Sequence, residues 1–332
     1  AEDGIRDYKV TGVQTCALPI LFYSNNFGLR VDVFRGETAF KPVEWLVRLE
    51  PVMNINYTKV EERNILYPNP QRGTDRFRDF VALQEGFLEL HLRDLSPNYD
   101  FLSSKWGLQS FNADFRGFVF TDTDLGARVF GNADNNHWQY NLIIFDKREK
   151  DTYSGLNSFQ SRDQYVLVAN VYRQDFFAKG YTAQISFLAN LDQGNIHYDR
   201  NGNIVRPAPL GDVRPHNLDV YYLGWNGDGH IGRLNISHAF YQAFGTDEYN
   251  GLAGQRTEIN AQMAALELSC DKDWLRPKLS LFYASGDSNA EDNKATGFDT
   301  ILDNPNFVGG PFTYWVRQGF NLGGTEIGRA HV

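Results

Sequence analysis

Hydrophobic and polar residues alternate along much of this chain. In residues 181–191, YTAQISFLANL, apolar side chains occupy every second position, and Thr, Gln, Ser and Asn occupy most of the others. Leu188 is the single apolar residue in the polar set. An α-helix would distribute these residues around its axis, whereas a strand places the two sets on opposite faces. The pattern therefore predicts a strand with one apolar and one polar face.

The same alternation recurs along the chain and predicts roughly a dozen strands and no long helix. The other candidate strands are residues 44–52, 85–95, 111–120, 137–145, 164–174, 217–225, 233–242, 258–268, 278–285 and 314–322. Glycine-containing segments at 124–127, 199–203 and 226–232 have the composition of tight turns. Two long connections are expected, at about 192–216 and about 286–312.

The length of the strands favours a membrane protein. Many candidates have about 9–11 residues, the length that crosses a bilayer at about 45°. Their apolar faces end in Tyr or Trp, as in the aromatic girdles of outer-membrane barrels. A sheet in lipid must close, because unpaired backbone groups there are costly. We therefore predict an all-β fold, an antiparallel up-and-down transmembrane β-barrel, and keep a soluble extracellular β-sandwich that binds carbohydrate as the alternative.

Both ends of the chain have an unusual character. The segment AEDGIRD, the later VTGVQTCALPI and the closing EIGRAHV resemble translated sequencing-adapter sequence. We expect residues 1–20 and 326–332 to be adapter-derived, and residues 21–325 to be a β-barrel domain that is incomplete at both ends. The first segment does not match a secretory signal, because its apolar run is interrupted and acidic residues outnumber basic ones near its start.

Composition narrows the function. The chain carries a net charge of −9 and 14% aromatic residues. Binding to nucleic acid needs a basic face, so no nucleic-acid partner is expected. Once Cys16 is set aside with the terminal segment, Cys270 stands alone, which excludes a disulfide framework and a cysteine metal cluster within residues 21–325.

Two segments resemble a known family. Residues 283–307, YASGDSNAEDNKATGFDTILDNPNF, resemble the late part of the alginate-export family of outer-membrane porins, and residues 111–132 have the same general character. The resemblance implies a porin of about 16–18 strands in the bacterial outer membrane, of which this chain is a fragment. The segment GFDTILDNP departs from the family pattern, so the resemblance does not identify alginate as the solute.

The polar faces supply candidate pore-lining residues. A charged and amide-rich lumen could pass small or polymeric solutes that are anionic or uncharged, saccharides among them. The alternative is that these residues pair across strands and only keep the interior solvated. The candidates are Asp114, Arg116, Arg128, Asn141, Arg173, Asp219, Arg233 and Asn235. The expected partners are therefore outer-membrane lipid and a solute.

Metal and enzyme chemistry have weaker support. An acidic loop could supply oxygen ligands for calcium, although its spacing is not that of an EF-hand. Its acids are Asp287, Glu291, Asp292, Asp299 and Asp303. Ser288 in the same loop has no histidine beside it in the sequence, and we expect no catalytic residues and no other cofactor.

Overall fold

The structure is a computed structural model that describes residues 20–36, 43–60, 66–67, 69–200, 202–207 and 211–308. Of the segments expected to be adapter-derived, 1–20 and 326–332, all but Ile20 lie outside the described residues, as does the expected strand at 314–322.

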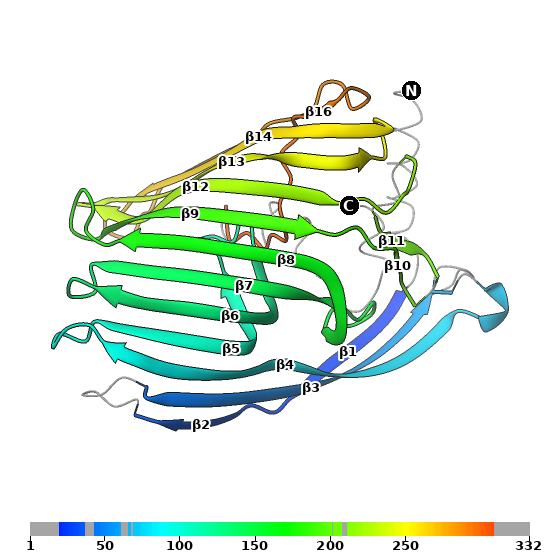
Figure 1. Ribbon diagram of the computed structural model, residues 1–332, viewed down its shortest axis with the longest axis horizontal. Coiled ribbons are helices and arrows are strands. Elements are labelled where there is room, and N and C mark those ends of the chain that lie inside the picture. The colour runs from blue at the N-terminus through cyan, green and yellow to red at the C-terminus, as the bar shows by residue number, and fades with distance from the viewer. Residues whose placement is uncertain are drawn as a thin grey trace.

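The strands lie side by side in chain order, as Figure 1 shows from β3 to β14. The order is β1-β3-β4-β5-β6-β7-β8-β9-β12-β13-β14-β15, and all these neighbours are antiparallel. The long strands are β1 (Ile20–Gly28), β3 (Trp45–Val60), β4 (Asp75–Asp94), β5 (Phe101–Asn112), β6 (Thr121–Ala133), β7 (Trp138–Lys150), β8 (Asn157–Arg173), β9 (Tyr181–Asp192), β12 (Leu218–Ile231), β13 (Leu234–Asn250), β14 (Gln255–Cys270) and β15 (Lys278–Ala284).

Short elements complete the fold. Strand β2 (Val31–Arg35) pairs with β3, and β16 (Lys294–Ala295) pairs in parallel with β14. The connection between β9 and β12 contains a two-stranded sheet of β10 (His197–Tyr198) and β11 (Ile204–Arg206). A single 3-10 turn, η1 (Pro70–Arg72), precedes β4. The predicted all-β, antiparallel, up-and-down fold is thus confirmed for the described part of the chain.

Several boundaries differ from the sequence prediction. Most strands are longer than expected, up to 20 residues in β4. Residues 124–127 and 226–231 lie inside β6 and β12 rather than in turns, and the turn after β12 is formed by Gly232 and Arg233. Residues 113–120 are not a strand but connect β5 to β6. No helix in the described part is long and apolar enough to cross a membrane.

The outer face of the sheet is apolar and exposed. Ile185 of β9 is 63% exposed, whereas its chain neighbour Gln184 on the opposite face is fully buried. The same outer row continues on neighbouring strands with Ile144, Val171, Leu223, Phe240 and Leu281, all exposed. Because the described strands form one large sheet and one two-stranded sheet, no second large sheet covers this face within the described ranges. The arrangement is not that of the alternative β-sandwich.

Tyr181 belongs to the same outer row but is buried. Its hydroxyl lies 2.7 Å from His238 Nε2, across the intervening strand β12. That crossing needs a glycine, because a Cβ at Gly227 would lie 2.2 Å from the Tyr181 hydroxyl oxygen. Trp225 of β12 also packs against His238, with ring centroids 4.6 Å apart. An aromatic group of this composition is typical of the interfacial girdle of membrane barrels.

The inner face carries an apolar stripe that crosses six strands. Leu188, which breaks the polar set of β9, belongs to this stripe and is fully buried. Each member of the stripe lies directly opposite the next member on the neighbouring strand. From β7 to β14 the members are Ile143, Val168, Leu188, Tyr222, Ala243 and Ala261. The stripe is part of the main hydrophobic cluster, together with Phe118, Phe120 and Phe307 from segments outside the strands. The inner face is therefore partly apolar because other chain segments lie against it.

Two turns at the same end of the strands, the β4–β5 turn and the β6–β7 turn, are joined through Asp100. Its carboxylate accepts hydrogen bonds from Ser96 Oγ at 2.8 Å and from the backbone N–H groups of Asn135 and Asn136 at 3.1 and 3.0 Å. Burial raises the pKa of Asp100, but these hydrogen bonds outweigh burial and leave the pKa below its ordinary value.

Because a lowered pKa favours the folded state only while the group is ionised, the link is expected to weaken as the pH falls below about 4. Replacing Asp100 by alanine should make amide hydrogen exchange at Asn135 and Asn136 faster at neutral pH. In the wild type the same exchange should accelerate, beyond the intrinsic pH dependence, only on acidification. Equal protection of both amides in the variant and the wild type would contradict the assigned link.

Candidate functional site: a polar cavity on the inner face

Residues 113–120 leave the sheet because local hydrogen bonds replace the strand ladder. The Asp114 carboxylate accepts the backbone N–H groups of Arg116, Gly117 and Phe118 at 2.8, 2.6 and 3.1 Å. Aspartate often bonds nearby backbone groups in this way, in competition with regular structure. Gly117 has a φ of 78°, a conformation that L-residues with a side chain rarely adopt.

This segment is attached to the inner face of distant strands. The backbone oxygen of Ala113 accepts from Asn170 Nδ2 on β8 at 3.2 Å and from Gln184 Nε2 on β9 at 2.6 Å. The Tyr241 hydroxyl on β13 donates to Asp114 Oδ2 at 2.9 Å. Polar side chains on the inner face therefore bind residues 113–120 in one position.

A second segment lies against the first. In Figure 1 the orange chain that follows β15 passes behind the front strands, and it meets residues 113–120 through backbone hydrogen bonds. Asn304 N donates to Gly117 O at 3.0 Å, and Asn306 N donates to Arg116 O at 2.8 Å. The Phe307 ring packs edge-on against Phe118, with centroids 5.4 Å apart. We call residues 113–120 and 298–307 the two inner segments.

A cavity of about 370 Å³, here called the inner polar cavity, lies between the first inner segment and strands β12 to β15. Arg116 reaches into it and donates from Nε to Ser237 Oγ at 2.9 Å. Its Nη2 lies 3.4 Å from carboxylate oxygens of both Asp228 and Glu267. Lys278 contacts Glu267 at 3.0 Å. Cations and carboxylates thus face one another around a polar space.

A second polar group lies on the inner face of β6 and β7. Arg128 donates to the amide oxygen of Asn141, and Asn141 Nδ2 donates to Asn170 Oδ1 at 2.9 Å. The Arg128 guanidinium lies over the Phe130 and Phe111 rings, at 4.4 and 5.1 Å from their centroids. Asn170 also donates to the backbone of Ala113, so the hydrogen bonds from Arg128 through Asn141 lead to the first inner segment.

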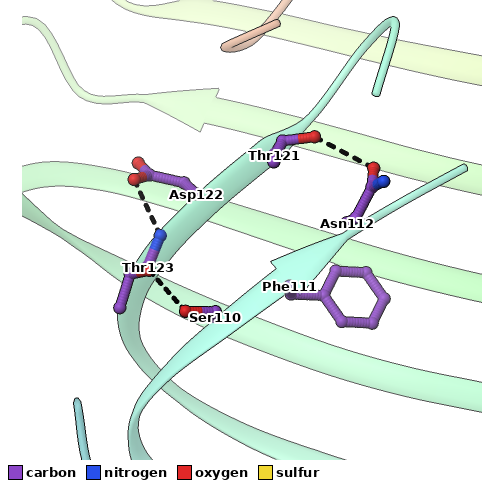
Figure 2. A pocket seen from close by; sticks show the side chains of 6 residues that line it. All are labelled: Ser110, Phe111, Asn112, Thr121, Asp122 and Thr123. Atoms are coloured by element: carbon purple, nitrogen blue, oxygen red, sulfur yellow. Dashed lines mark hydrogen bonds between the residues drawn. The ribbon is translucent and has the colours of Figure 1, made fainter. Parts of the chain in front are cut away.

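Figure 2 shows a pocket where β5 ends and β6 begins, with a volume of about 390 Å³. Thr121 Oγ1 donates to Asn112 Oδ1 at 2.9 Å, and the hydroxyls of Ser110 and Thr123 lie 2.7 Å apart. Phe111 points away from these groups. Because its polar groups satisfy one another, this pocket is a strand-end contact rather than a candidate site.

The structure places five of the eight candidate pore-lining residues inside. Asp114 and Arg116 lie in the first inner segment, and Arg128, Asn141 and Asn235 lie on the inner face of strands. Arg116 and Asn235 line the same cavity. Their role in solute passage stays a prediction.

Three candidates lie elsewhere, contrary to the expected inward position. Arg173 is on the outer row at the end of β8, where it stacks 4.9 Å from the Trp138 ring centroid and contacts Asp134 at 3.1 Å. Asp219 has the same parity in β12 as exposed Leu223, which puts it on the outer row. Arg233 is in the turn between β12 and β13.

The five acids of the expected calcium loop do not converge. Asp287 and Asp292 accept backbone N–H groups of Asn289 and Lys294, whereas Asp303 accepts the hydroxyl of Thr300 in the second inner segment. Within the described ranges, no group of three or more His, Cys, Asp or Glu side chains could hold a metal ion.

Four Asp, Glu, Lys and Arg residues that line the inner polar cavity were not among the predicted pore-lining residues. They are Asp228, Glu267, Arg276 and Lys278. The phase of alternation could have identified Glu267, because it shares the face of Ala261 and Met263 on β14. Arg276 lies in the turn after β14, where alternation gives no direction.

Comparison with known proteins identifies no family. No protein-family model matches the chain, and no curated protein matches it. Among solved structures, the outer membrane channel DcaP of Acinetobacter baumannii aligns with 9% identity and a TM-score of 0.36, over 84% of this chain and 94% of that one. So remote a likeness carries no argument about this chain. The class comes from the geometry itself: an antiparallel up-and-down sheet with an exposed apolar outer face and a partly polar inner face.

Proposed function

We propose that this chain is part of a porin-like channel of the bacterial outer membrane, through which solutes diffuse or are exported. The observation that carries the proposal is the contrast between the two faces of one sheet. Apolar side chains such as Ile185 and Leu223 are exposed on the outer face, where lipid would cover them. Cations and carboxylates line a cavity on the inner face.

The inner segments set the selectivity of the proposed channel. They occupy part of the interior, so a solute has to pass the groups that remain accessible beside them. Arg116 is the residue of the first segment whose guanidinium reaches the inner polar cavity, and its side chain is 26% exposed. Anionic and uncharged solutes, saccharides among them, are the expected cargo, and the chain is proposed to act without catalysis.

Channel formation is testable by conductance. The protein reconstituted in a planar bilayer should give discrete current steps, and absence of steps would contradict the proposal. The soluble alternative predicts no conductance and no stable insertion.

Replacing Arg116 by glutamine should shift the zero-current potential in a salt gradient toward cation selectivity, because one positive charge leaves the lumen. The matched control is Arg233→Gln, which removes the same charge from the turn between β12 and β13. The control should leave the potential unchanged. An equal shift in both variants would show that Arg116 has no special position in the conducting path.

A further inference from the structure

A second cavity, of about 460 Å³, lies at the end of the sheet opposite the turn between β12 and β13. We call it the mouth cavity. The connection between β9 and β12 forms one wall with Arg206 and His216, and the ends of strands form another with Arg162 of β8 and Asp247 of β13. Its volume is in the range of small-molecule sites.

Two arginines in the mouth cavity have hydrogen-bonding capacity that the protein does not use. Arg206 is 7% exposed, and its Nη1 lies 3.2 Å from Glu149 Oε1. The buried Nε atoms of both Arg206 and Arg162 have no hydrogen-bond partner within the described part of the chain. Burial has the largest effect on the pKa of Arg206 and lowers it, and the nearby charge of Arg162 lowers it further. The carboxylates of Glu149, Asp192 and Asp163 act in the opposite direction, but the pKa stays below its ordinary value.

A buried N–H without an acceptor is costly, and each such group calls for an explanation. Both arginines line the cavity. Two guanidinium groups that line one cavity are suited to a carboxylate, which accepts several hydrogen bonds at once. This part of the cavity therefore favours an anionic group on a ligand.

The remaining charges of the mouth cavity are negative. Asp192 and Asp299 line it, and among the described residues neither carboxylate has a salt-bridge partner. The other two lining carboxylates are paired, Asp247 with His216 at 3.2 Å and Asp212 with Arg214 at 2.6 Å. A solute with several negative charges would be repelled by these carboxylates, whereas an ammonium group would be attracted to them.

We infer that the mouth cavity binds a zwitterionic solute of amino-acid size, with its carboxylate toward Arg162 and Arg206 and its ammonium group toward Asp192 and Asp299. This inference deepens the proposed channel function, on which it rests, because it names a class of solute collected at the channel mouth. The mixed charges disfavour polyanions, so the class is narrower than anionic or uncharged solutes in general.

The inference can be tested by calorimetric titration of the full chain in detergent micelles. The probes are L-glutamine as the zwitterion, propionate as the carboxylate alone, propylamine as the ammonium alone, and trigalacturonate as a polyanion. Glutamine should bind at least about tenfold more tightly than any other probe, a factor equivalent to about 1.4 kcal/mol. Equal affinities, or tighter binding of trigalacturonate, would overturn the inference.

Variants locate the binding groups. Arg162→Gln and Arg206→Gln should each weaken glutamine binding at least about tenfold, and Asp299→Asn should weaken glutamine binding but leave propionate binding unchanged. The control Arg233→Gln removes a positive charge at the opposite end of the sheet and should bind glutamine like the wild type. Because Arg206 is buried, near-ultraviolet circular dichroism should first show that its variant is folded, and Arg162→Gln gives the same test at a less buried site. Unchanged affinity in the folded arginine variants would refute the assigned site.

The binding experiment is independent of the membrane. A protein that binds glutamine in micelles but gives no current in a bilayer would support this site and contradict the channel. A protein that conducts but does not bind glutamine would contradict this inference and leave the channel standing.

Discussion

Replacing Asp114 by alanine is expected to release residues 113–120 from the inner face and to lower the free energy of unfolding by about 3 kcal/mol or more. The carboxylate is 4% exposed and accepts three backbone N–H groups and the Tyr241 hydroxyl. Removing this acceptor leaves several buried donors unpaired, at about 1–3 kcal/mol each without strict additivity. Denaturant unfolding followed by tryptophan fluorescence measures the loss.

The same variant should change conductance. A released first segment no longer holds Arg116 in the inner polar cavity, so single-channel current should rise or become noisy. Tyr241→Phe removes one of the four hydrogen bonds and leaves the turn of residues 114–118 intact, so it should have a clearly smaller effect on both readings. If the two variants were equally destabilised, the backbone hydrogen bonds to Asp114 would not be what holds the segment.

Replacing Ile185 by arginine should impair insertion into a bilayer, by about 2–4 kcal/mol if the residue lies near the midplane. Ile185 is 63% exposed on the outer row of β9. In a soluble protein an already exposed side chain can become charged at little cost, so the variant separates the two proposed classes. The measurement is the yield of folded protein in lipid vesicles, followed by the shift of the heat-modifiable band on gels.

The matched control for this variant is Leu252→Arg. Leu252 is 53% exposed in the turn between β13 and β14, away from the outer rows of the strands. It should insert like the wild type. Equal insertion of both variants would contradict the assignment of the outer face to lipid.

Alternation predicted most strands because a side-chain period of two depends on the local backbone alone. It failed at residues 113–120, where apolar and polar residues alternate as in a strand but the Asp114 side chain accepts hydrogen bonds from the backbone that follows it. The competing turn could not be recognised from periodicity. A turn was likewise wrongly predicted at 226–231, where the chain continues as strand β12. Gly227 and Gly229 lie in this strand because atoms of the neighbouring strands and turns approach their Cα atoms too closely for a side chain.

The candidate site was only partly predictable. Asn141 lies inside, as the phase of its predicted strand indicated. Arg128 also lies inside, although no strand was predicted around it. The phase of β8 puts Arg173 outside, on the row of Val171, contrary to the inward position predicted for it. The partners of Arg116 could not be inferred, because Ser237 and Glu267 are far away in the sequence and meet it only in the folded chain.

The contacts of the two inner segments join residues that are far apart in the sequence, and this affects the order in which the chain can fold. Neighbouring strands of the sheet are also neighbours along the chain, so hairpins can form one after another with little loss of loop entropy. The inner segments instead bring together Arg116 with Glu267 and Asn306, which are 151 and 190 residues away. These contacts require that β14 be in place and that the chain beyond β15 has been made. The interior can therefore be completed only after most of the sheet has formed, although its hairpins are local.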